Sequence, residues 1–199
     1  MYDLLITGGT VVDGTGTPGV RADVGVAEGR ITAIGDLSGA DATETVDATG
    51  KVVCPGFVDP HTHYDAQLFW DPHATPSSLH GITSIVMGNC GFTLAPISDE
   101  SDAAYLAAMM VKVEGMSPAA LEIGVDWDWR TTADYLARLD GNVGVNVAAM
   151  VGHCALRRAV LKDDATTREA TPDEVAEMQR LLAEGLEAGG LGFSTSRSF

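Results

Sequence analysis

Residues 54–72 read CPGFVDPHTHYDAQLFWDP, and they place His61 and His63 one residue apart at the end of an apolar run. The chain of 199 residues holds five histidines, so this pair is a concentrated feature. The stretch also separates two patterns of sequence. Short strand-like runs with tight turns precede it, and longer apolar runs separated by helical segments follow it.

The segment before the histidine pair, residues 1–52, predicts a small β domain. Short runs of alternating apolar and polar residues are separated by glycine-containing turns, including Gly8-Gly9, and no helical period appears. Consecutive strands joined by tight turns are typical of an antiparallel meander. The expected strands span residues 3–7, 10–12, 22–27 and 30–34.

Residues 53–199 predict a parallel α/β domain. Its expected strands are apolar nearly throughout, which is typical of strands buried on both faces of a parallel sheet. Helical stretches separate these strands, and such alternation predicts a parallel sheet that is either open or closed into a barrel. The expected strands span residues 52–59, 82–88, 143–151 and 191–195.

The clearest helix is expected over residues 172–188. Thr171 and Glu174 have the spacing of a capping box, and Pro172 between them suits the first helical position. Apolar residues then recur at spacings of three and four, which gives the helix one buried face. Two further helices are expected over 102–113 and 132–139, and residues 114–129 are expected to form a long loop.

Acidic residues outnumber basic ones by 28 to 12, which gives a net charge of −16. Nucleic acids and anionic membranes bind basic surfaces, so the charge excludes both as partners. The longest apolar runs fall short of the roughly 20 residues of a membrane span, and the N-terminus lacks the basic region of a signal peptide. The three cysteines, Cys54, Cys90 and Cys154, are widely spaced, which favours free thiols in a reducing cytoplasm.

The histidine pair has the spacing of a metal site. Residues i and i+2 of an extended segment point to the same side, so His61 and His63 can present two imidazoles to one point. The next strand ends in Asn89-Cys90-Gly91, at the edge where α/β barrels carry their active sites. Imidazole and thiolate both bind zinc, so His61, His63 and Cys90 are the candidate ligands. The alternatives are two metal-free loop histidines and a cysteine that packs as a small apolar residue.

The third and fourth strands also end in polar residues. His153 follows the third strand and can contact substrate, transfer a proton or support a metal ligand. Arg197 follows the fourth strand, and its planar guanidinium can pair with a substrate carboxylate. A hydrogen-bonded loop histidine and a surface arginine are the alternatives. Nearer the histidine pair, Asp59 is a candidate support for a ligand, and Asp65 is expected to cap a helix or lie in a solvated loop.

Longer motifs around these residues resemble the amidohydrolase superfamily, and within it the N-acyl-D-amino-acid deacylase, or D-aminoacylase, branch. The resemblance covers essentially the whole chain, and the combination of motifs is specific. The matching segments are PGFVDPHTHYDAQ at 55–67, HGITSIVMGNCGF at 80–92, VEGM at 113–116, VDWDW at 125–129, VGHCALR at 151–157 and GLGFSTS at 190–196.

The resemblance implies a β-sandwich segment over residues 1–52, followed by the first half of a (β/α)8, TIM-like barrel over residues 53–199. It implies one or two zinc ions, held here by His61, His63 and Cys90, and a small-molecule substrate such as an N-acyl-D-amino acid. The family's later metal-binding histidines and its general-base aspartate have no counterpart in this sequence, so the base is expected beyond residue 199.

Two local departures from the best-known deacylases leave the choice of substrate open. Those enzymes carry a second acidic residue directly after the histidine pair, where this chain has Tyr64-Asp65. They also carry a glycine after the Ser-Thr of the fourth strand, where this chain has Ser196-Arg197.

The number of residues also predicts a partial barrel. A full barrel takes about 250 residues, or about 31 for each βα unit, so the residues after 52 suffice for between four and five units. A partial barrel leaves sheet edges and apolar surface uncovered, so a complementary C-terminal half or a second copy of the chain is the expected partner. The isolated chain is expected to have little or no hydrolase activity, and turnover that His61→Ala abolishes would contradict this.

Two other functions stay open at this point. A cyclic amidase or deaminase of the same superfamily often relies on a carboxylated lysine in the fourth strand, but Lys162 is the last lysine in the chain. A catalytically silent binding or assembly subunit would keep the histidines without a metal. Stoichiometric zinc that is lost on Cys90→Ala would favour the deacylase over the silent subunit.

Overall fold

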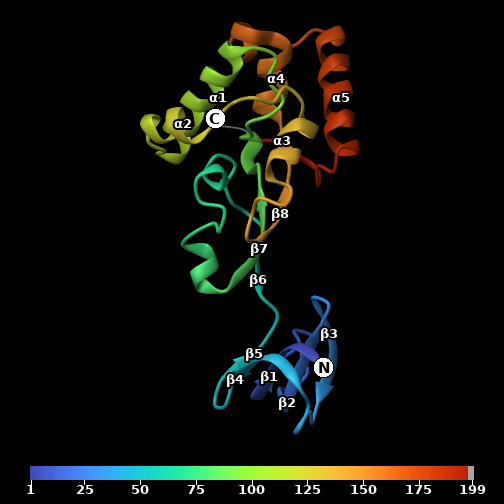
Figure 1. Cartoon of the computed structure of the whole chain (residues 1–199). Helices are drawn as coiled ribbons and strands as arrows, with labels where there is room; N and C mark the ends of the chain where they lie inside the picture. The colour runs from blue at the N-terminus through green and yellow to red at the C-terminus, as the bar shows by residue number, and fades with distance from the viewer. Residues whose placement is uncertain (197–199) are drawn as a thin grey trace. The chain divides into compact units, whose positions relative to one another are not determined.

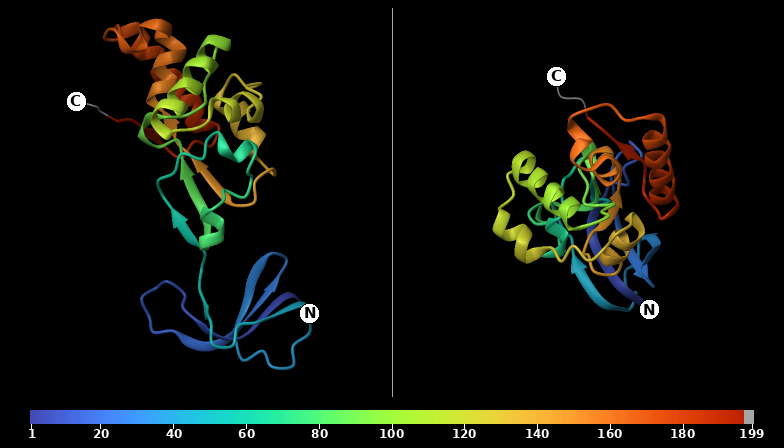
Figure 2. Two further views of the ribbon diagram at one scale, coloured as in Figure 1. Left: turned by 90° about the vertical axis from the view of Figure 1, so that its left-hand side faces the viewer. Right: turned by 90° about the horizontal axis from the view of Figure 1, so that it is seen from above.

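The chain divides into two units, Met1–Gly56 and Phe57–Phe199, and the computed structural model describes residues 1–196 (Figure 1). The helices α1 to α5 all belong to the second unit, which Figure 2 shows from two further directions. In the described part of the chain, no helix is long and apolar enough to span a membrane.

The first unit is a sheet with strand order β3-β2-β1-β4, in which β5 also pairs with β1. Its first three strands form the predicted antiparallel meander. The later strands β4 and β5 lie parallel to β1, which a meander pattern does not predict. The strands are β1 (Tyr2–Val11), β2 (Val20–Ala27), β3 (Arg30–Gly35), β4 (Ala42–Asp47) and β5 (Val52–Val53).

The predicted turn at Gly8-Gly9 is wrong, because both glycines lie inside the single strand β1. They occupy an irregularity in the pairing with β2, between Ile6 and Gly9. A Cβ added at Gly9 would lie 2.6 Å from the Cγ2 atom of Val53. Gly9 therefore permits the close approach of β5 to β1. The sequence did not predict this role, because a Gly-Gly pair is also typical of a turn.

The second unit contains short parallel strands. Strands β6, β7 and β8 form a sheet in that order, and β9 pairs with β10. All of these pairs are parallel, as the alternation of strands and helices predicted. The strands are β6 (Phe57–Asp59), β7 (Ile82–Met87), β8 (Asn146–Ala149), β9 (Val151–Gly152) and β10 (Phe193–Ser194).

The expected continuous strand over residues 52–59 is wrong. Val52–Val53 pair with β1, whereas Phe57–Asp59 pair with β7, and three residues connect them. The connection contains Pro55, which has no backbone N–H to give to a ladder. The expected burial of this strand on both faces is also wrong, because Phe57 is 59% exposed and Val58 is 63% exposed. Within residues 1–196, β6 pairs only with β7.

Three of the helices agree with the sequence pattern. The helix α3 has the predicted bounds, and α5 begins with the predicted capping box between Thr171 and Glu174. Two helices were missed: α2 lies inside the expected loop 114–129, and α4 starts directly after β9 without any turn signal. The α-helices are α1 (Glu100–Glu114), α2 (Pro118–Gly124), α3 (Thr132–Leu139), α4 (His153–Leu161) and α5 (Pro172–Glu187). The 3₁₀ helices are η1 (Gln67–Phe69), η2 (Ser77–His80), η3 (Asn89–Gly91) and η4 (Lys162–Thr166).

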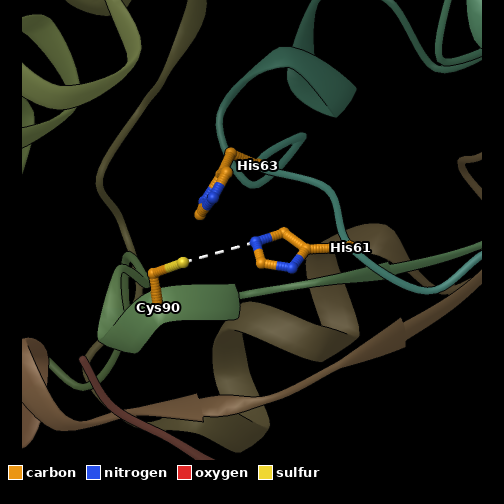
Figure 3. A group of neighbouring side chains, drawn as sticks. All are labelled: His61, His63 and Cys90. Atoms are coloured by element: carbon orange, nitrogen blue, oxygen red, sulfur yellow. Dashed lines mark hydrogen bonds between the residues drawn. The ribbon is translucent and has the colours of Figure 1, made fainter.

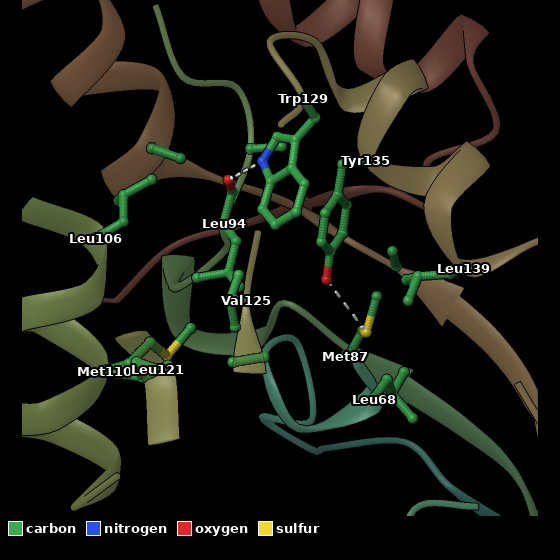
Figure 4. Packing of buried hydrophobic residues seen from close by; sticks show 14 of the residues in the cluster. Leu68, Met87, Leu94, Leu106, Met110, Leu121, Val125, Trp129, Tyr135 and Leu139 are labelled. Carbon is green, nitrogen blue, oxygen red and sulfur yellow. Dashed lines mark hydrogen bonds between the residues drawn. The ribbon is translucent and has the colours of Figure 1, made fainter. Parts of the chain in front are cut away.

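An aromatic cluster lies in the core of the second unit (Figure 4). Trp129 is 1% exposed, stacks on Phe69 at 5.1 Å between ring centroids, and donates its indole N–H to the Leu94 carbonyl at 2.7 Å. Tyr135 packs edge-on against Trp129, and its hydroxyl donates to the Asp65 carbonyl at 2.9 Å. The core therefore reaches the segment that carries the histidine pair and holds its backbone.

A group of charged and polar side chains joins α1 to α4 and η4, and we call it the helix network. Its centre is Asp102, which has no exposed side-chain surface. One Asp102 oxygen accepts from Arg158 Nε at 2.9 Å, and the other accepts from Lys162 Nζ at 2.6 Å and from the Ser98 hydroxyl at 2.6 Å. Both oxygens of the buried carboxylate are therefore paired with donors. The helix network comprises Ser98, Asp99, Asp102, Arg158 and Lys162.

Candidate metal centre

The structure brings His61, His63 and Cys90 together at the carboxyl ends of β6 and β7 (Figure 3). Each offers one ligand atom, and these atoms all lie within 4.8 Å of one another. The Cys90 sulfur is 3.3 Å from His61 Nε2, and the two imidazole rings lie 5.5 Å apart between centroids. The side chains therefore converge as their spacing predicted, while their role as metal ligands stays a prediction.

The histidine segment is held by the residue between the two histidines. Thr62 is 6% exposed, and both its backbone N–H and its hydroxyl donate to the Val86 carbonyl at 2.9 Å. Because Thr62 turns towards β7, its neighbours His61 and His63 share the opposite side of the segment. The Asp59 carboxylate accepts from the His61 backbone N–H at 3.2 Å, so it supports the backbone of a candidate ligand and not its ring.

Cys90 lies in a sharply bent loop. Its φ is 58°, in the left-handed region that residues other than glycine rarely adopt, and Gly88 and Gly91 flank it at φ of 75° and 87°. The Asn89 side-chain amide donates to the Val86 carbonyl at 2.9 Å and, over a longer 3.4 Å, to the Thr62 carbonyl. The cysteine loop is therefore tied to the same point of β7 as the histidine segment.

Glu114, the last residue of α1, faces His63. Its Oε1 atom is 3.7 Å from His63 Nδ1, a buried atom that has no hydrogen-bond partner. Burial lowers the pKa of His63 and outweighs the opposing attraction of Glu114, so the imidazole is held neutral. A carboxylate at a helix C-terminus opposes the helix dipole, so this position is unfavourable for stability alone. Sequence reasoning missed Glu114, although it lies in the VEGM motif.

The expectation for Asp65 is wrong, because it neither caps a helix nor lies in solvent. It is 1% exposed, its Oδ2 atom accepts the Gly88 backbone N–H at 3.0 Å, and its Oδ1 atom has no partner. Burial raises the pKa of Asp65 to about 7, although the Gly88 N–H acts to lower it. No local sequence signal marked this burial, since the partner Gly88 lies 23 positions further along the chain.

His153 and Arg197 are the two predicted substrate contacts. His153 opens α4, its Nδ1 atom lies 3.0 Å from the Thr195 hydroxyl, and burial lowers its pKa. Among residues 1–196, it is not part of the convergent group of possible ligands. Arg197 lies outside the residues that the structure describes. Of the other cysteines, Cys54 is exposed in the connection after β5 and not within a strand, and burial raises the pKa of Cys154.

The donor set fits zinc. Three ligands of a tetrahedral zinc ion, at about 2.0–2.3 Å from it, lie roughly 3.3–3.8 Å from one another. The distance of 3.3 Å between the Cys90 sulfur and His61 Nε2 falls in that range. Because all three ligand atoms lie within 4.8 Å of one another, a small side-chain rotation brings the remaining distances into it. The unpaired Nδ1 of His63 and the Glu114 carboxylate beside it match the usual arrangement in which a ligating histidine donates its second N–H to an acid.

An open hollow of about 500 Å³ lies beside the candidate ligands. His61 and His63 line it together with Tyr64, Gln67 and Glu114. The lining is polar, so a small molecule with hydrogen-bonding groups could lie against the histidine pair.

The sequence matches one known family. The profile of the Amidohydrolase family matches residues 44–199 of this chain. A D-aminoacylase from Alcaligenes xylosoxydans xylosoxydans is 44% identical over 195 residues, which are 98% of this chain and 37% of that protein.

Several solved structures are similar along nearly the whole chain. A D-aminoacylase described as having a binuclear metal center gives a TM-score of 0.82 at 42% identity, over 98% of this chain and 38% of that one. The N-acyl-D-glutamate deacylase of Bordetella bronchiseptica, complexed with zinc and a phosphonate mimic of the tetrahedral intermediate, gives 0.80 at 39% identity, also over 98% and 38%. The chain therefore has the mixed α/β fold of these proteins and spans less than two-fifths of their length.

Proposed function

This chain belongs to the amidohydrolase family, and from that membership we propose that it is the N-terminal part of a zinc-dependent hydrolase that cleaves the amide bond of N-acyl-D-amino acids or similar N-acyl compounds. The D-aminoacylase and the N-acyl-D-glutamate deacylase, each similar over nearly the whole chain, carry this activity in their names. One observation carries the proposal: His61, His63 and Cys90 converge at the ends of two adjacent parallel strands.

For the architecture, we propose a β-sandwich segment over residues 1–52 and the first half of a (β/α)8 barrel over residues 53–199. The parallel order β6-β7-β8 and the parallel pair β9-β10 support the half barrel, because neighbouring strands follow one another along the chain. The helices α1 to α3 fall between β7 and β8, and α4 and α5 fall between β9 and β10, as in βα units.

In this proposal, His61 and His63 bind zinc as neutral imidazoles, and Cys90 binds it as a thiolate. When bound, zinc supplies the Lewis acidity that polarises an amide carbonyl and promotes the ionisation of water. The Glu114 carboxylate lies 3.7 Å from His63 Nδ1, where it can accept the Nδ1–H of a zinc-bound imidazole, and the lowered pKa of His63 keeps the ring available as a ligand. We assign the general base to no residue of this sequence.

The proposed substrate contacts are His153 and Arg197. Nδ1 of His153 is engaged by the Thr195 hydroxyl, so Nε2 is the atom that we assign to the substrate. Arg197 would pair with the carboxylate of the amino-acid portion. We also propose a reducing, cytoplasmic setting, since Cys54, Cys90 and Cys154 are free thiols. A complementary C-terminal half or a second copy of the chain is the proposed protein partner.

Zinc titration against a chromophoric chelator tests the metal site. The chain is expected to bind near-stoichiometric zinc, and Cys90→Ala is expected to lower the affinity about 100-fold, because removing even a supporting partner of a ligand costs 10- to 100-fold. Cys54→Ala is the matched control, since Cys54 is exposed and outside the ligand group. Equal zinc binding by the chain and by Cys90→Ala would overturn the proposal.

The substrate class is tested with the longer protein of which we propose this chain to be the N-terminal part. The assay compares the hydrolysis of an N-acetyl-D-amino acid, of its L enantiomer and of a cyclic imide. We expect release of the free D-amino acid and its loss in His61→Ala. Faster hydrolysis of the cyclic imide would favour a cyclic amidase instead. The 199-residue chain alone is expected to show little or no turnover in the same assay.

A further inference from the structure

Two serine hydroxyls from the end of the chain hold the loop that carries Cys90. Ser194 ends β10, and Ser196 follows it two residues later, yet both contact residues 88–91. Ser194 is separated from Gly88 by 106 positions in the sequence, so this is a tertiary contact that no local pattern encodes.

The buried hydroxyl of Ser194 makes two hydrogen bonds to the loop. It accepts from the Gly91 backbone N–H at 3.1 Å and donates to the Gly88 carbonyl. Ser194 is 8% exposed, and its backbone is fixed by the parallel pairing of β10 with β9. The Ser196 hydroxyl adds a third bond by donating to the Cys90 carbonyl at 2.9 Å. Ser194 and Ser196, at and just after the end of β10, therefore hydrogen-bond to backbone groups on both sides of the Cys90 side chain.

The loop needs such support because its backbone is unfavourable. Cys90 is held in the left-handed region at φ 58°, where its Cβ atom approaches the backbone carbonyl unfavourably. Its neighbour Gly91 packs closely on β9, where a Cβ at Gly152 would lie 2.6 Å from the Gly91 carbonyl oxygen. A loop released from Ser194 would relax towards an ordinary conformation and carry the Cys90 sulfur away from the histidines.

We propose that Ser194, assisted by Ser196, is the positioning residue for Cys90, and that it holds the sulfur within ligand distance of His61 and His63. This inference rests on the zinc site proposed above. The role is one of geometry, since the Ser194 hydroxyl hydrogen-bonds to the backbone of the loop.

The test uses the full chain with Cys54→Ala and Cys154→Ala, so that Cys90 is the one thiol. Ser194→Ala is expected to lower zinc affinity about 10- to 100-fold, the usual effect of removing a partner that orients a ligand. It is also expected to weaken the thiolate-to-cobalt charge-transfer band of the cobalt(II) form. The matched control is Ser84→Ala: its hydroxyl, half-buried in β7, accepts from Asn146 Nδ2 at 3.3 Å, away from the loop. We expect this control to change neither measurement.

A metal-free measurement separates this inference from the zinc proposal. The rate at which iodoacetamide alkylates Cys90 without metal is expected to change in Ser194→Ala and to stay the same in Ser84→Ala. If the chain binds no zinc but the alkylation rate still changes, the zinc proposal fails and the positioning role stands. An unchanged alkylation rate and an unchanged zinc affinity in Ser194→Ala would overturn the positioning role.

Urea unfolding shows whether Ser194→Ala remains folded. If it does not, Ser196→Ala takes its place, because Ser196 is exposed and its side chain makes a single bond to the loop. A change in the alkylation rate of Cys90 in Ser196→Ala would support the role, and no change would overturn it.

Discussion

The second unit contains two polar clusters that differ in how completely their atoms are paired. In the helix network, both oxygens of the buried Asp102 accept from charged donors. At the strand ends, His63 Nδ1 and Asp65 Oδ1 are buried without any hydrogen-bond partner. These two are the only side-chain atoms of that kind within residues 1–196. Pairing in the helix network therefore serves stability, whereas the segment that carries the histidine pair retains buried polar atoms without partners.

The largest expected effect is on the helix network. Asp102→Ala leaves Arg158, whose side chain is 7% exposed, without its buried partner, which is expected to lower the free energy of unfolding by about 3–5 kcal/mol. Asp163→Ala is the control, because Asp163 also pairs with Arg158 but is 96% exposed, and it is expected to cost less than about 1 kcal/mol. Urea unfolding measures both. Equal losses in the two variants would contradict a stabilising role of the buried pair between Asp102 and Arg158.

A smaller loss is expected at the strand ends. Asp65→Ala leaves the buried Gly88 N–H without an acceptor, which is expected to cost about 1–3 kcal/mol in urea unfolding. Asp65→Asn keeps an oxygen for Gly88 and is expected to cost less. If Asp65→Asn destabilised the chain as much as Asp65→Ala, the hydrogen bond to Gly88 would not be the cause.

Glu114→Gln tests whether a residue of the site serves binding at the expense of stability. Removing the charge beside His63 is expected to lower zinc affinity about tenfold. It should also raise the free energy of unfolding by about 0.3–1 kcal/mol, because the acid opposes the dipole at the C-terminus of α1. Glu100→Gln, at the exposed opposite end of the same helix, is the control for zinc affinity. Unchanged zinc affinity in Glu114→Gln would remove Glu114 from the site.

The smallest expected effect is a change in how stability depends on pH. Burial acts to raise the pKa of Asp102, but the bonds from Lys162 and Ser98 outweigh it and hold the pKa below its ordinary value of 3.8. The folded chain therefore binds fewer protons at this site than the unfolded chain, so the contribution is present above pH 3.8 and is lost as pH falls through the lowered value. Urea unfolding at a series of acidic pH values should show that the free energy of unfolding falls less steeply with decreasing pH in Asp102→Asn. If it falls equally steeply in both proteins, Asp102 is not the source of the acid dependence.

Local patterns predicted those parts of the molecule that local interactions form. The helix α3 has the predicted bounds, and the capping box of α5 was visible in Thr171 and Glu174. The convergence of His61, His63 and Cys90 followed from two strand ends that meet at one edge, since parallel strands place their carboxyl ends together.

The parts that were missed depend on contacts between distant segments. Asp65 lies 23 positions before Gly88, and its burial follows from packing that no pattern within residues 61–68 encodes. The contacts of Ser194 with the cysteine loop span more than 100 positions. The helix α4 was missed because β9 runs into it without a turn, so its start carried none of the usual signals.

The backbone of Cys90 also limits how this site can change over evolution. Among residues with a side chain, asparagine and aspartate adopt the left-handed region most readily, so they are the replacements that the loop tolerates best. Aspartate would put an oxygen where the sulfur now lies. Because carboxylates suit magnesium, calcium and manganese whereas thiolates select zinc, one substitution could redirect the choice of ion while the loop keeps its shape.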